Sequence, residues 1–541
     1  MILNYNGIQD RAAWEAAGVQ LPKHDWKAMC AETAENPVWV HFGAGNIFRI
    51  FVAGLMQRLL DAGEAKAGII AVETFDREVV DRIYVPHDSM TLAVSLRPDG
   101  GIDKAVNASI AKGVVVADPE GWEELKAIFR KPSLQMLSFT ITEKGYALRD
   151  MKGELLAPAA ADIEAGPTVP KTAMGVVASL LLERYNSGKT SGTGPVPIAV
   201  VSMDNCSHNG EKLRAGVTEM AIEWQKKGFV SEDYVNWLLD ESKVSFPWSM
   251  IDKITPRPAE VVEQQLTALG IEDMAPIVTA KHTYIAPFVN AEVPQYLVVE
   301  DRFPNGRPAL EKAGVYMTDR DTVNMTERMK VTTCLNPLHT ALAVYGCLLG
   351  YEKICDEMKD PELVKLVNRI GYVEGLPVVT DPGILSPRAF IDEVVGQRLP
   401  NPFMPDTPQR IACDTSQKIP IRFGETIKSY MADPEKDAAS LTAIPLALAG
   451  WLRYLLGVDD KGSEMPVSPD PMLAALQADL SGITLGDPDS VGDKLAPILT
   501  NPNLFGVSLK DAGLDEKVTG YFKELLAGKG AVRATLVKYL D

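Results

Sequence analysis

The sequence contains only six cysteines. They are scattered along 541 residues, with no C-x-x-C pair and no Cys/His ligand spacing. This pattern is typical of reduced thiols and argues against both a disulfide framework and a structural zinc site. We therefore expect a cytoplasmic protein without a bound metal. The six positions are Cys30, Cys206, Cys334, Cys347, Cys355 and Cys413.

Long apolar runs and basic blocks are also missing. No stretch of 18 uninterrupted apolar residues occurs, and the nearest candidate, 441–458, contains Pro445 and Arg453. That segment therefore predicts a buried or amphipathic helix rather than a membrane span. No Lys/Arg block has nucleic-acid-binding length, and a net charge of -18 repels phosphate backbones. Neither a membrane nor a nucleic acid is an expected partner.

The first third of the chain alternates β-branched runs with helical patterns. Hydrophobic residues make up 46% and charged residues 23%, which is typical of a globular protein, and the length predicts at least two cores. Strands alternating with helices favour a parallel sheet. Residues 187–197 are rich in Gly, Ser and Pro and predict a loop. The expected strands are 38–42, 68–72, 134–142 and 198–203, with helices at 51–62 and 121–129.

The pattern becomes mostly helical from about Pro337 onward. We expect an α/β domain in 1–288 followed by a mainly helical domain in 289–541. The change of pattern lies between Phe288 and Lys330, with a strand at 296–300 near it. The expected helices of the second domain are 340–349, 361–370, 437–456, 471–480 and 517–526.

A strand at 38–42 leads into a glycine turn. Gly43 permits the turn, and Gly45 lets the backbone approach a pyrophosphate at the start of the following helix. Phe48 occupies the place of a third glycine, so a plain strand-to-helix turn is an equal alternative. The next strand ends at Glu73, whose carboxylate is suited to the ribose hydroxyls and favours NAD over NADP. Asp76 is the alternative acceptor, and both acids could instead cap the loop.

The run from 327 to 339 contains four polar groups in an apolar neighbourhood. Glu327, Lys330, Asn336 and His339 supply a carboxylate, an amine, an amide and an imidazole, the groups needed to move a proton on or off a hydroxyl without a metal. Asn336 before Pro337 also predicts a helix N-cap. Glu327 could alternatively form a simple i,i+3 ion pair with Lys330.

Seven blocks, in order along most of the chain, resemble the polyol-specific long-chain dehydrogenase/reductase family, also called the mannitol dehydrogenase family. Only about the last hundred residues carry no such block. The blocks are HFGAGNIFR at 41–49, TITEKGY at 140–146, MDNCSHNG at 203–210, FPWSMIDKITP at 246–256, EDRFPNGRPALEKAG at 300–314, the run 327–339, and RIACDTSQKIP at 410–420.

The resemblance implies a two-domain enzyme, with a Rossmann-like dinucleotide-binding domain in 1–288 and a mainly helical substrate-binding and catalytic domain in 289–541. It also implies NAD-dependent, metal-independent hydride transfer at a secondary alcohol or ketone. It gives Lys330 the role of general acid/base, and it makes Asn205 and Asn336 the donors to the developing oxyanion. It implies that His339 holds a substrate hydroxyl and that Glu327 conducts protons near Lys330. The cofactor contacts it implies are Gly43, Gly45, Asn46, Arg49, Glu73, Glu143 and Lys144.

The resemblance also places Arg410, Lys418 and Asp252 around the substrate. Two cations suit a sugar carboxylate, since Arg grips a carboxylate through two hydrogen bonds, although Lys418 could merely pair with Asp414. We therefore expect a hexuronate substrate, with interconversion of D-mannonate and D-fructuronate. Mannitol 2-dehydrogenase, another polyol dehydrogenase and tagaturonate reductase are the alternatives. A non-catalytic NAD-binding sensor is the alternative of another class. We expect a monomer or a small homo-oligomer.

One departure concerns the spacing between Lys330 and Asn336. The family pattern has four intervening residues, and this chain has five. On a continuous helix the extra residue would turn Lys330 by about 100 degrees. We therefore expect an irregular or bulged segment that absorbs it, ahead of a helix that begins after Asn336.

Overall fold

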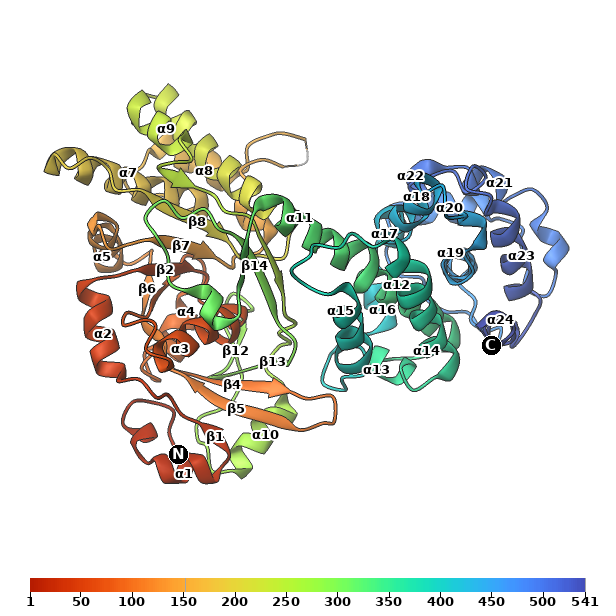
Figure 1. The fold of residues 1–541 in the computed structure, drawn as a ribbon, viewed down its shortest axis with the longest axis horizontal. Coiled ribbons are helices and arrows are strands. Elements are labelled where there is room, and N and C mark those ends of the chain that lie inside the picture. The colour runs from red at the N-terminus through yellow and green to blue at the C-terminus, as the bar shows by residue number, and fades with distance from the viewer. Residues whose placement is uncertain (151, 541) are drawn as a thin grey trace. The chain divides into compact units, whose positions relative to one another are not determined.

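The chain folds into two compact units. A computed structural model describes residues 1–150 and 152–540. Unit 1 comprises Met1–Leu96 and Gly101–Asn324, and unit 2 comprises Arg97–Gly100 and Met325–Asp541 (Figure 1). The division falls inside the interval where the sequence pattern changes. It lies later than the expected boundary at 288/289, so residues 289–324 belong to unit 1.

Unit 1 is built on a six-stranded parallel sheet with the order β6-β3-β2-β7-β8-β9. In chain order this is 3-2-1-4-5-6, the arrangement of a doubly wound dinucleotide-binding sheet, and the strand order reverses between β2 and β7. The α/β prediction is confirmed. The strands are β2 (Trp39–Phe42), β3 (Ile69–Glu73), β6 (Ile110–Val115), β7 (Met136–Phe139), β8 (Ile198–Ser202) and β9 (Val244–Ser245).

Both faces of this sheet are buried, because alternate residues of each strand enter different cores. In β2, Val40 and Phe42 pack with helices on one face, whereas Trp39 packs with the other core. Continuous apolar strands of this kind are typical of parallel sheets covered on both sides. The helices of unit 1 are α1 (Arg11–Ala16), α2 (Trp26–Glu35), α3 (Ala53–Asp61), α4 (Arg77–Val79), α5 (Pro119–Arg130), α6 (Ala157–Ala165), α7 (Ala173–Ser191), α8 (Asn209–Lys226), α9 (Glu232–Leu239) and α10 (Glu260–Ala268).

The smaller sheets explain why residues 289–324 belong to unit 1. β13 pairs in parallel with β4, and β14 pairs antiparallel with β10, so both strands complete sheets begun earlier in the chain. β14 spans Tyr296–Glu300, the range expected from the sequence. The remaining strands are β1 (Val19–Gln20), β4 (Thr91–Leu96), β5 (Ile102–Asn107), β10 (Ser249–Asp252), β11 (Ile277–Val278), β12 (Tyr284–Ile285), β13 (Phe288–Glu292) and β15 (Tyr316–Thr318).

The loop expected at 187–197 is partly helical, so that prediction was wrong for its first residues. α7 continues to Ser191 and ends at Gly192, whose φ of 73° is left-handed. Gly188 lies within the helix because the chain passes close to it: a Cβ there would lie 2.4 Å from the Cα of Pro195. Gly188 was expected in a loop, but in the structure it allows close packing between α7 and Pro195.

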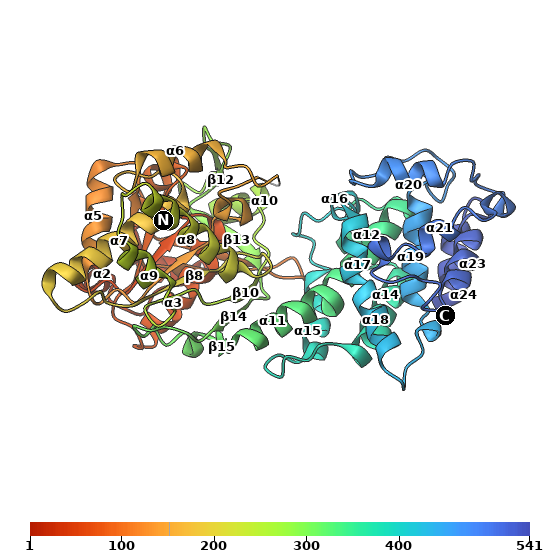
Figure 2. The same ribbon diagram turned by 90° about the horizontal axis from the view of Figure 1, so that it is seen from above.

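Unit 2 is a helical assembly around the buried helices α12 and α19 (Figure 2). All of α19 is buried, as expected for a core helix, and no described helix is long and apolar enough to cross a membrane. α11 (Arg320–Met329) contains the division between the units at Asn324 and Met325. The helices that follow are α12 (Asn336–Leu349), α13 (Ile354–Glu357), α14 (Pro361–Asn368), α15 (Pro387–Glu393), α16 (Pro408–Ile411), α17 (Thr415–Arg422), α18 (Gly424–Ala432), α19 (Ala443–Tyr454), α20 (Leu473–Asp479), α21 (Ala496–Leu499), α22 (Pro502–Phe505), α23 (Asp515–Leu525) and α24 (Ala531–Leu540).

The C-terminal half of α12 packs against a buried carboxyl group. A Cβ at Gly346 would lie 2.1 Å from Oε1 of Glu357. Neither carboxyl oxygen of Glu357 has a hydrogen-bond partner among the described residues, and burial raises the pKa of this group well above its usual value. Burial therefore favours the neutral form of Glu357, which lies enclosed beside α12.

Candidate active site

The glycine turn follows β2 where the strand order of the sheet reverses. Gly43 has a φ of 103°, and a Cβ there would lie 2.3 Å from the carbonyl oxygen of Thr140, at the end of β7. Gly45 has open space instead, with no atom within 4 Å of the place that a Cβ would occupy. Arg49 N donates to Gly45 O (3.1 Å), so the following helix begins at the turn. This open cradle at a helix start fits a pyrophosphate.

Glu73 connects the glycine turn with the loop after β3. Its Oε2 accepts from Ala44 N (3.3 Å), and its Oε1 accepts from the backbone N–H groups of Phe75 (2.7 Å) and Asp76 (3.0 Å). The carboxylate therefore braces the loop. A carboxylate has about four acceptor positions, so these bonds leave room for a ribose hydroxyl.

Asp76, the alternative ribose acceptor, is committed to neighbouring side chains. Its Oδ2 accepts from the hydroxyls of Thr279 and Thr283, each at 2.6 Å, and its Oδ1 accepts from Glu78 N. Burial acts to raise the pKa of Asp76, but these hydrogen bonds outweigh burial and lower it. The geometry favours Glu73 over Asp76 as the group available to a ribose.

Asn46 and Arg49, the other residues expected near the turn, differ in their surroundings. The Nδ2 of Asn46 donates to Tyr284 O (3.2 Å), and its Oδ1 is buried without a partner among the described residues. The guanidinium of Arg49 is fully buried and donates to Thr91 Oγ1 and to the carbonyls of Ala286 and Pro287. Through these contacts Arg49 connects the helix after the glycine turn with β4 and with the chain before β13. A direct role of Arg49 in cofactor binding stays a prediction.

Asp204 joins the two loops that follow β7 and β8. Its carboxylate accepts from the backbone N–H groups of Ile141 (2.9 Å) and Thr142 (3.0 Å) and from the hydroxyl of Tyr146. Burial raises its pKa despite these bonds. The β7 loop carries Glu143 and Lys144, and the β8 loop carries Asn205; all three side chains are exposed. Asp204 thus fixes the loops that present the predicted residues.

The predicted residue Asp252 ends β10 and is buried at 5% exposure. Its backbone pairs with Tyr296 of β14. The neighbouring Lys253 donates through Nζ to Glu292 O at 2.7 Å. Asp252 therefore lies on a rigid strand of unit 1.

In unit 2, Lys330 is the first residue of a π-helical turn, η6 (Lys330–Cys334), between α11 and α12. Leu335 N donates to Lys330 O at 3.1 Å, the i→i+5 bond of a π turn. Lys330 is 3% exposed, and Glu327 lies one turn earlier on α11, half-buried. The prediction of a bulged segment agrees with this turn, because a π turn contains one residue more than an α-helical turn.

Asn336 is the first residue of α12 and does not cap it through its side chain. The capping position is Leu335, which makes no side-chain cap bond, so the N-cap prediction was wrong. Instead the Asn336 carbonyl accepts from Thr340 Oγ1 at 2.9 Å, and Thr340 Oγ1 accepts from Arg422 Nη1 at 2.6 Å. This chain of bonds connects the start of α12 with the end of α17 and leaves the Asn336 amide for other contacts.

His339 faces Asp406, which in turn holds Arg410. His339 Nε2 lies 3.7 Å from Asp406 Oδ2, and Arg410 Nη2 lies 2.9 Å from Asp406 Oδ1. The Nε2 atom is buried and has no hydrogen-bond partner among the described residues. Burial lowers the pKa of His339 to about 4, and nearby guanidinium groups, Arg422 first, add to this effect against the charge of Asp406. The imidazole is therefore neutral near pH 7.

Lys418 lies on α17, four residues before Arg422. Its Nζ donates to the carbonyls of Ile411 (3.0 Å) and Cys413, so it does not form the simple pair with Asp414 that the sequence left open. Burial lowers the pKa of Lys418, and the charge of Arg422 lowers it further. Arg410 and Lys418 therefore both lie in the His339 region of unit 2.

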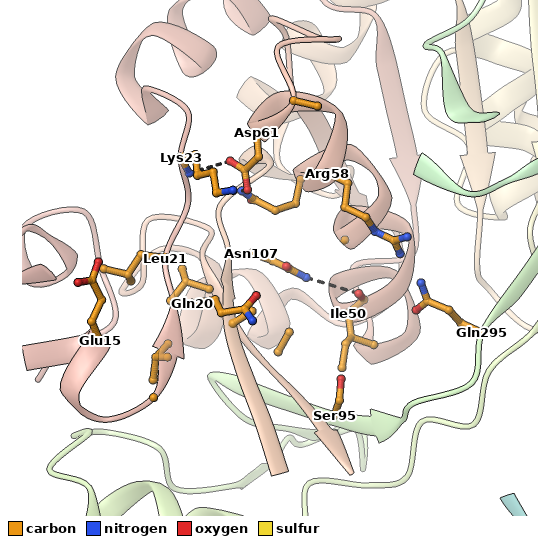
Figure 3. A pocket seen from close by; sticks show the side chains of 18 of the residues that line it. Glu15, Gln20, Leu21, Lys23, Ile50, Arg58, Asp61, Ser95, Asn107 and Gln295 are labelled. Carbon is orange, nitrogen blue, oxygen red and sulfur yellow. Dashed lines mark hydrogen bonds between the residues drawn. The ribbon is translucent and has the colours of Figure 1, made fainter. Parts of the chain in front are cut away.

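Unit 1 also contains a cavity of about 1040 Å³ that lies away from the glycine turn. It is bordered by α3, β4, β5 and the chain around β1, and Figure 3 shows Arg58, Asp61 and Asn107 along it. None of the predicted site residues lines it. The glycine turn lies before α3, whereas Arg58 and Asp61 lie in its last turns, so this cavity is separate from the predicted cofactor site.

Four residues of the site were missed in the sequence: Asp204, Thr340, Asp406 and Arg422. Arg422 had a usable signal, because it lies one helical turn after Lys418 and next to the last matching block. Asp406 had no such signal, since its partner His339 is 67 residues away in the sequence (406 minus 339).

Comparison with family models divides the chain at nearly the same place as the structure does. The model described as Mannitol dehydrogenase Rossmann domain matches residues 38–312, and the model described as Mannitol dehydrogenase C-terminal domain matches residues 322–526. The interval between the two matches lies just before the division at Asn324 and Met325.

Similar proteins extend over the full length. A D-mannonate oxidoreductase of Thermotoga maritima is 54% identical over 540 residues, covering 99% of this chain and 98% of that protein. A substrate-free D-sorbitol dehydrogenase structure matches with a TM-score of 0.79 and 26% identity, covering 99% of this chain and 100% of the other. The Pseudomonas fluorescens mannitol 2-dehydrogenase ternary complex with NAD and D-mannitol matches with a TM-score of 0.68 and 26% identity, covering 100% and 99%.

Proposed function

Because this chain belongs to the mannitol dehydrogenase family, we propose that it interconverts D-mannonate and D-fructuronate without a metal, with Lys330 as the general acid/base. The resemblance seen in the sequence is confirmed, and the chain is an NAD-dependent dehydrogenase acting on a CH–OH group. The observation that carries the choice of substrate is the 54% identity with the Thermotoga maritima D-mannonate oxidoreductase.

The residues around the glycine turn fit NAD. The open space at Gly45 and the orphaned Oδ1 of Asn46 leave room and an acceptor beside a helix start, and Glu73 supplies an acid at the end of β3. When bound, NAD supplies the hydride acceptor and donor. An acid at this place favours ribose hydroxyls and disfavours a 2′-phosphate.

The residues of the run 327–339 supply the proton chemistry of the proposal. During reduction Lys330 gives a proton to the ketone oxygen, and during oxidation it takes the proton back from the hydroxyl. The family resemblance gives the amides of Asn336 and Asn205 the role of donating to the oxygen that gains negative charge. Neutral His339, with its Nε2 unpartnered among the described residues, is available to a substrate hydroxyl.

Steady-state kinetics with NADH test this function. We expect the highest kcat/KM for D-fructuronate among four substrates: D-fructuronate, D-tagaturonate, D-fructose and L-sorbose. Each assay is run with and without a chelator, and we expect no loss of turnover on chelation. A higher kcat/KM for D-fructose would instead assign a polyol dehydrogenase, the activity named for the Pseudomonas fluorescens relative. Loss of activity on chelation would contradict metal independence.

A further inference from the structure

Arg422 of unit 2 forms no ion pair with an acid among the described residues. Arg422 donates through Nη1 to Thr340 Oγ1, and no carboxylate of the described residues pairs with its guanidinium. Burial lowers its pKa to about 10, which leaves it charged near pH 7. Arg422 is half-buried, and a charge partly withdrawn from water without a counter-charge is costly and is normally balanced by a partner. The partner of Arg422 is therefore not supplied by the described residues of unit 2.

Arg410 differs from Arg422 in both charge balance and exposure. Arg410 is 64% exposed and forms an ion pair with Asp406 at 2.9 Å. A carboxylate that bound Arg410 would compete with this acid. Arg422 has one hydroxyl partner, and four of its five N–H donors remain without a partner among the described residues. Of the two guanidinium groups, Arg422 is the better prepared to receive an anion.

The position of Arg422 connects it with the residues of the proposed reaction. Thr340, which fixes its Nη1, is adjacent to His339 and bonds to the carbonyl of Asn336. Lys418 lies one turn earlier on α17, close enough for the charge of Arg422 to lower its pKa. α17 itself packs against α12 and η6. Two cations thus lie beside the expected substrate groups of a chain whose net charge is -18.

We propose that Arg422 binds the carboxylate of the sugar-acid substrate and so selects a uronate over a neutral sugar. The inference rests on the proposed function, whose substrate class it explains. The planar guanidinium grips a carboxylate through two parallel N–H···O bonds. Thr340 holds the guanidinium in place, and Lys418 adds positive charge.

Binding to the enzyme–NADH complex tests the role of Arg422 without turnover. D-mannonate does not react there, because both the sugar acid and the cofactor are reduced, and D-mannitol is its uncharged counterpart. By titration calorimetry we expect Arg422→Gln to weaken D-mannonate binding about 100-fold and to change D-mannitol binding less than threefold. Arg422→Lys should restore part of the loss. The matched control is Arg328→Gln, since Arg328 is an exposed arginine that pairs with Glu425.

Kinetics complete the test and separate the two proposals. Arg422→Gln should lower kcat/KM for D-fructuronate about 100-fold relative to D-fructose, with an unchanged melting temperature. If both ligands lose affinity equally, or if neither does, Arg422 does not read the carboxylate. If wild-type enzyme prefers D-fructose while Arg422→Gln selectively weakens D-mannonate binding, the proposed function fails and the role of Arg422 stands.

Discussion

His339 shows how the protein fixes the protonation state of one side chain. The imidazole is enclosed, and the nearby acid Asp406 also pairs with Arg410. Burial holds its pKa at about 4, against an ordinary value of 6.5. A neutral imidazole can both donate and accept hydrogen bonds, whereas the charged form only donates. His339 is therefore able to act both as a hydrogen-bond donor and as a hydrogen-bond acceptor near pH 7.

This pKa predicts an acid-side loss of stability. Because the folded-state pKa is depressed, the contribution of His339 is fully present above pH 6.5 and is lost as the pH falls toward 4. The depression corresponds to about 3 kcal/mol. We expect His339→Asn to lose less unfolding free energy than wild type between pH 7 and pH 4, by up to that amount, in urea titrations. Exposed His282 provides the control: His282→Asn should follow wild type. Parallel curves for His339→Asn would contradict an enclosed neutral imidazole.

At this scale the sequence indicates the residue types of the site but not their partners. Lys330, Asn336 and His339 lie within ten residues and are recognisable from their chemistry alone. Asp406 contacts His339 only because α12 and the chain before α16 pack together. The same holds for Arg422 and Thr340, which are 82 residues apart in the sequence. Partners of this kind depend on tertiary packing.

At the scale of the elements, the π turn η6 sets the position of Lys330 relative to α12. α11 ends at Met329 and α12 begins at Asn336, and η6 accommodates the additional residue between them. A π turn is less favourable than an α-helical turn and is often found at functional sites. Lys330, the first residue of this turn, is buried at 3% exposure.

Deletion of Val331 tests the π turn. Removing this half-buried residue gives the four-residue spacing within a chain adapted to five, and it turns Lys330 by about 100 degrees relative to α12. We expect kcat to fall at least about 100-fold, with NADH binding retained in a fluorescence titration. The matched control is Val331→Ala, which keeps the spacing and should retain most activity. Wild-type kcat after deletion would show that the turn does not set the position of Lys330.

The elements were predicted well where local pattern and tertiary packing agree. The strand at 296–300 matches β14, and the five helices expected in the second half correspond to α12, α14, α19, α20 and α23, although α19 begins six residues later than expected. Other helices of unit 2, such as α15, α17, α18 and α24, were not predicted. The end of α7 was not predicted, because Gly188 lies within the helix, where Pro195 packs close to it, and not in a turn. The boundary at 288/289 differs for a similar reason: β13 and β14 pair with strands far back in the sequence.

At the scale of the whole molecule, the chain combines a cofactor-type unit with a helical unit. Gly43, Gly45 and Glu73 lie in unit 1, and Lys330, His339 and Arg422 lie in unit 2. Each unit has its own buried core. We therefore expect NADH binding to slow amide hydrogen exchange mainly in unit 1.

Hydrogen exchange measured by mass spectrometry tests this expectation. Saturating NADH should slow amide exchange in peptides that contain the glycine turn and the loop after β3, because bound ligand suppresses local opening. NADPH is the matched control and should protect these peptides less, since its 2′-phosphate meets the carboxylate of Glu73. Equal protection by both cofactors would contradict NAD preference. Protection confined to residues 325–540 would contradict the assignment of the cofactor site to unit 1.

The contact between Gly346 and Glu357 matters for anyone who engineers the substrate range of this enzyme. A side chain at position 346 would meet Oε1 of a carboxyl group that is already enclosed. Libraries that vary α12 should therefore spare its last two turns. Substitutions at Gly346 are expected to reduce the yield of folded protein, because an added side chain would meet the enclosed carboxyl group of Glu357.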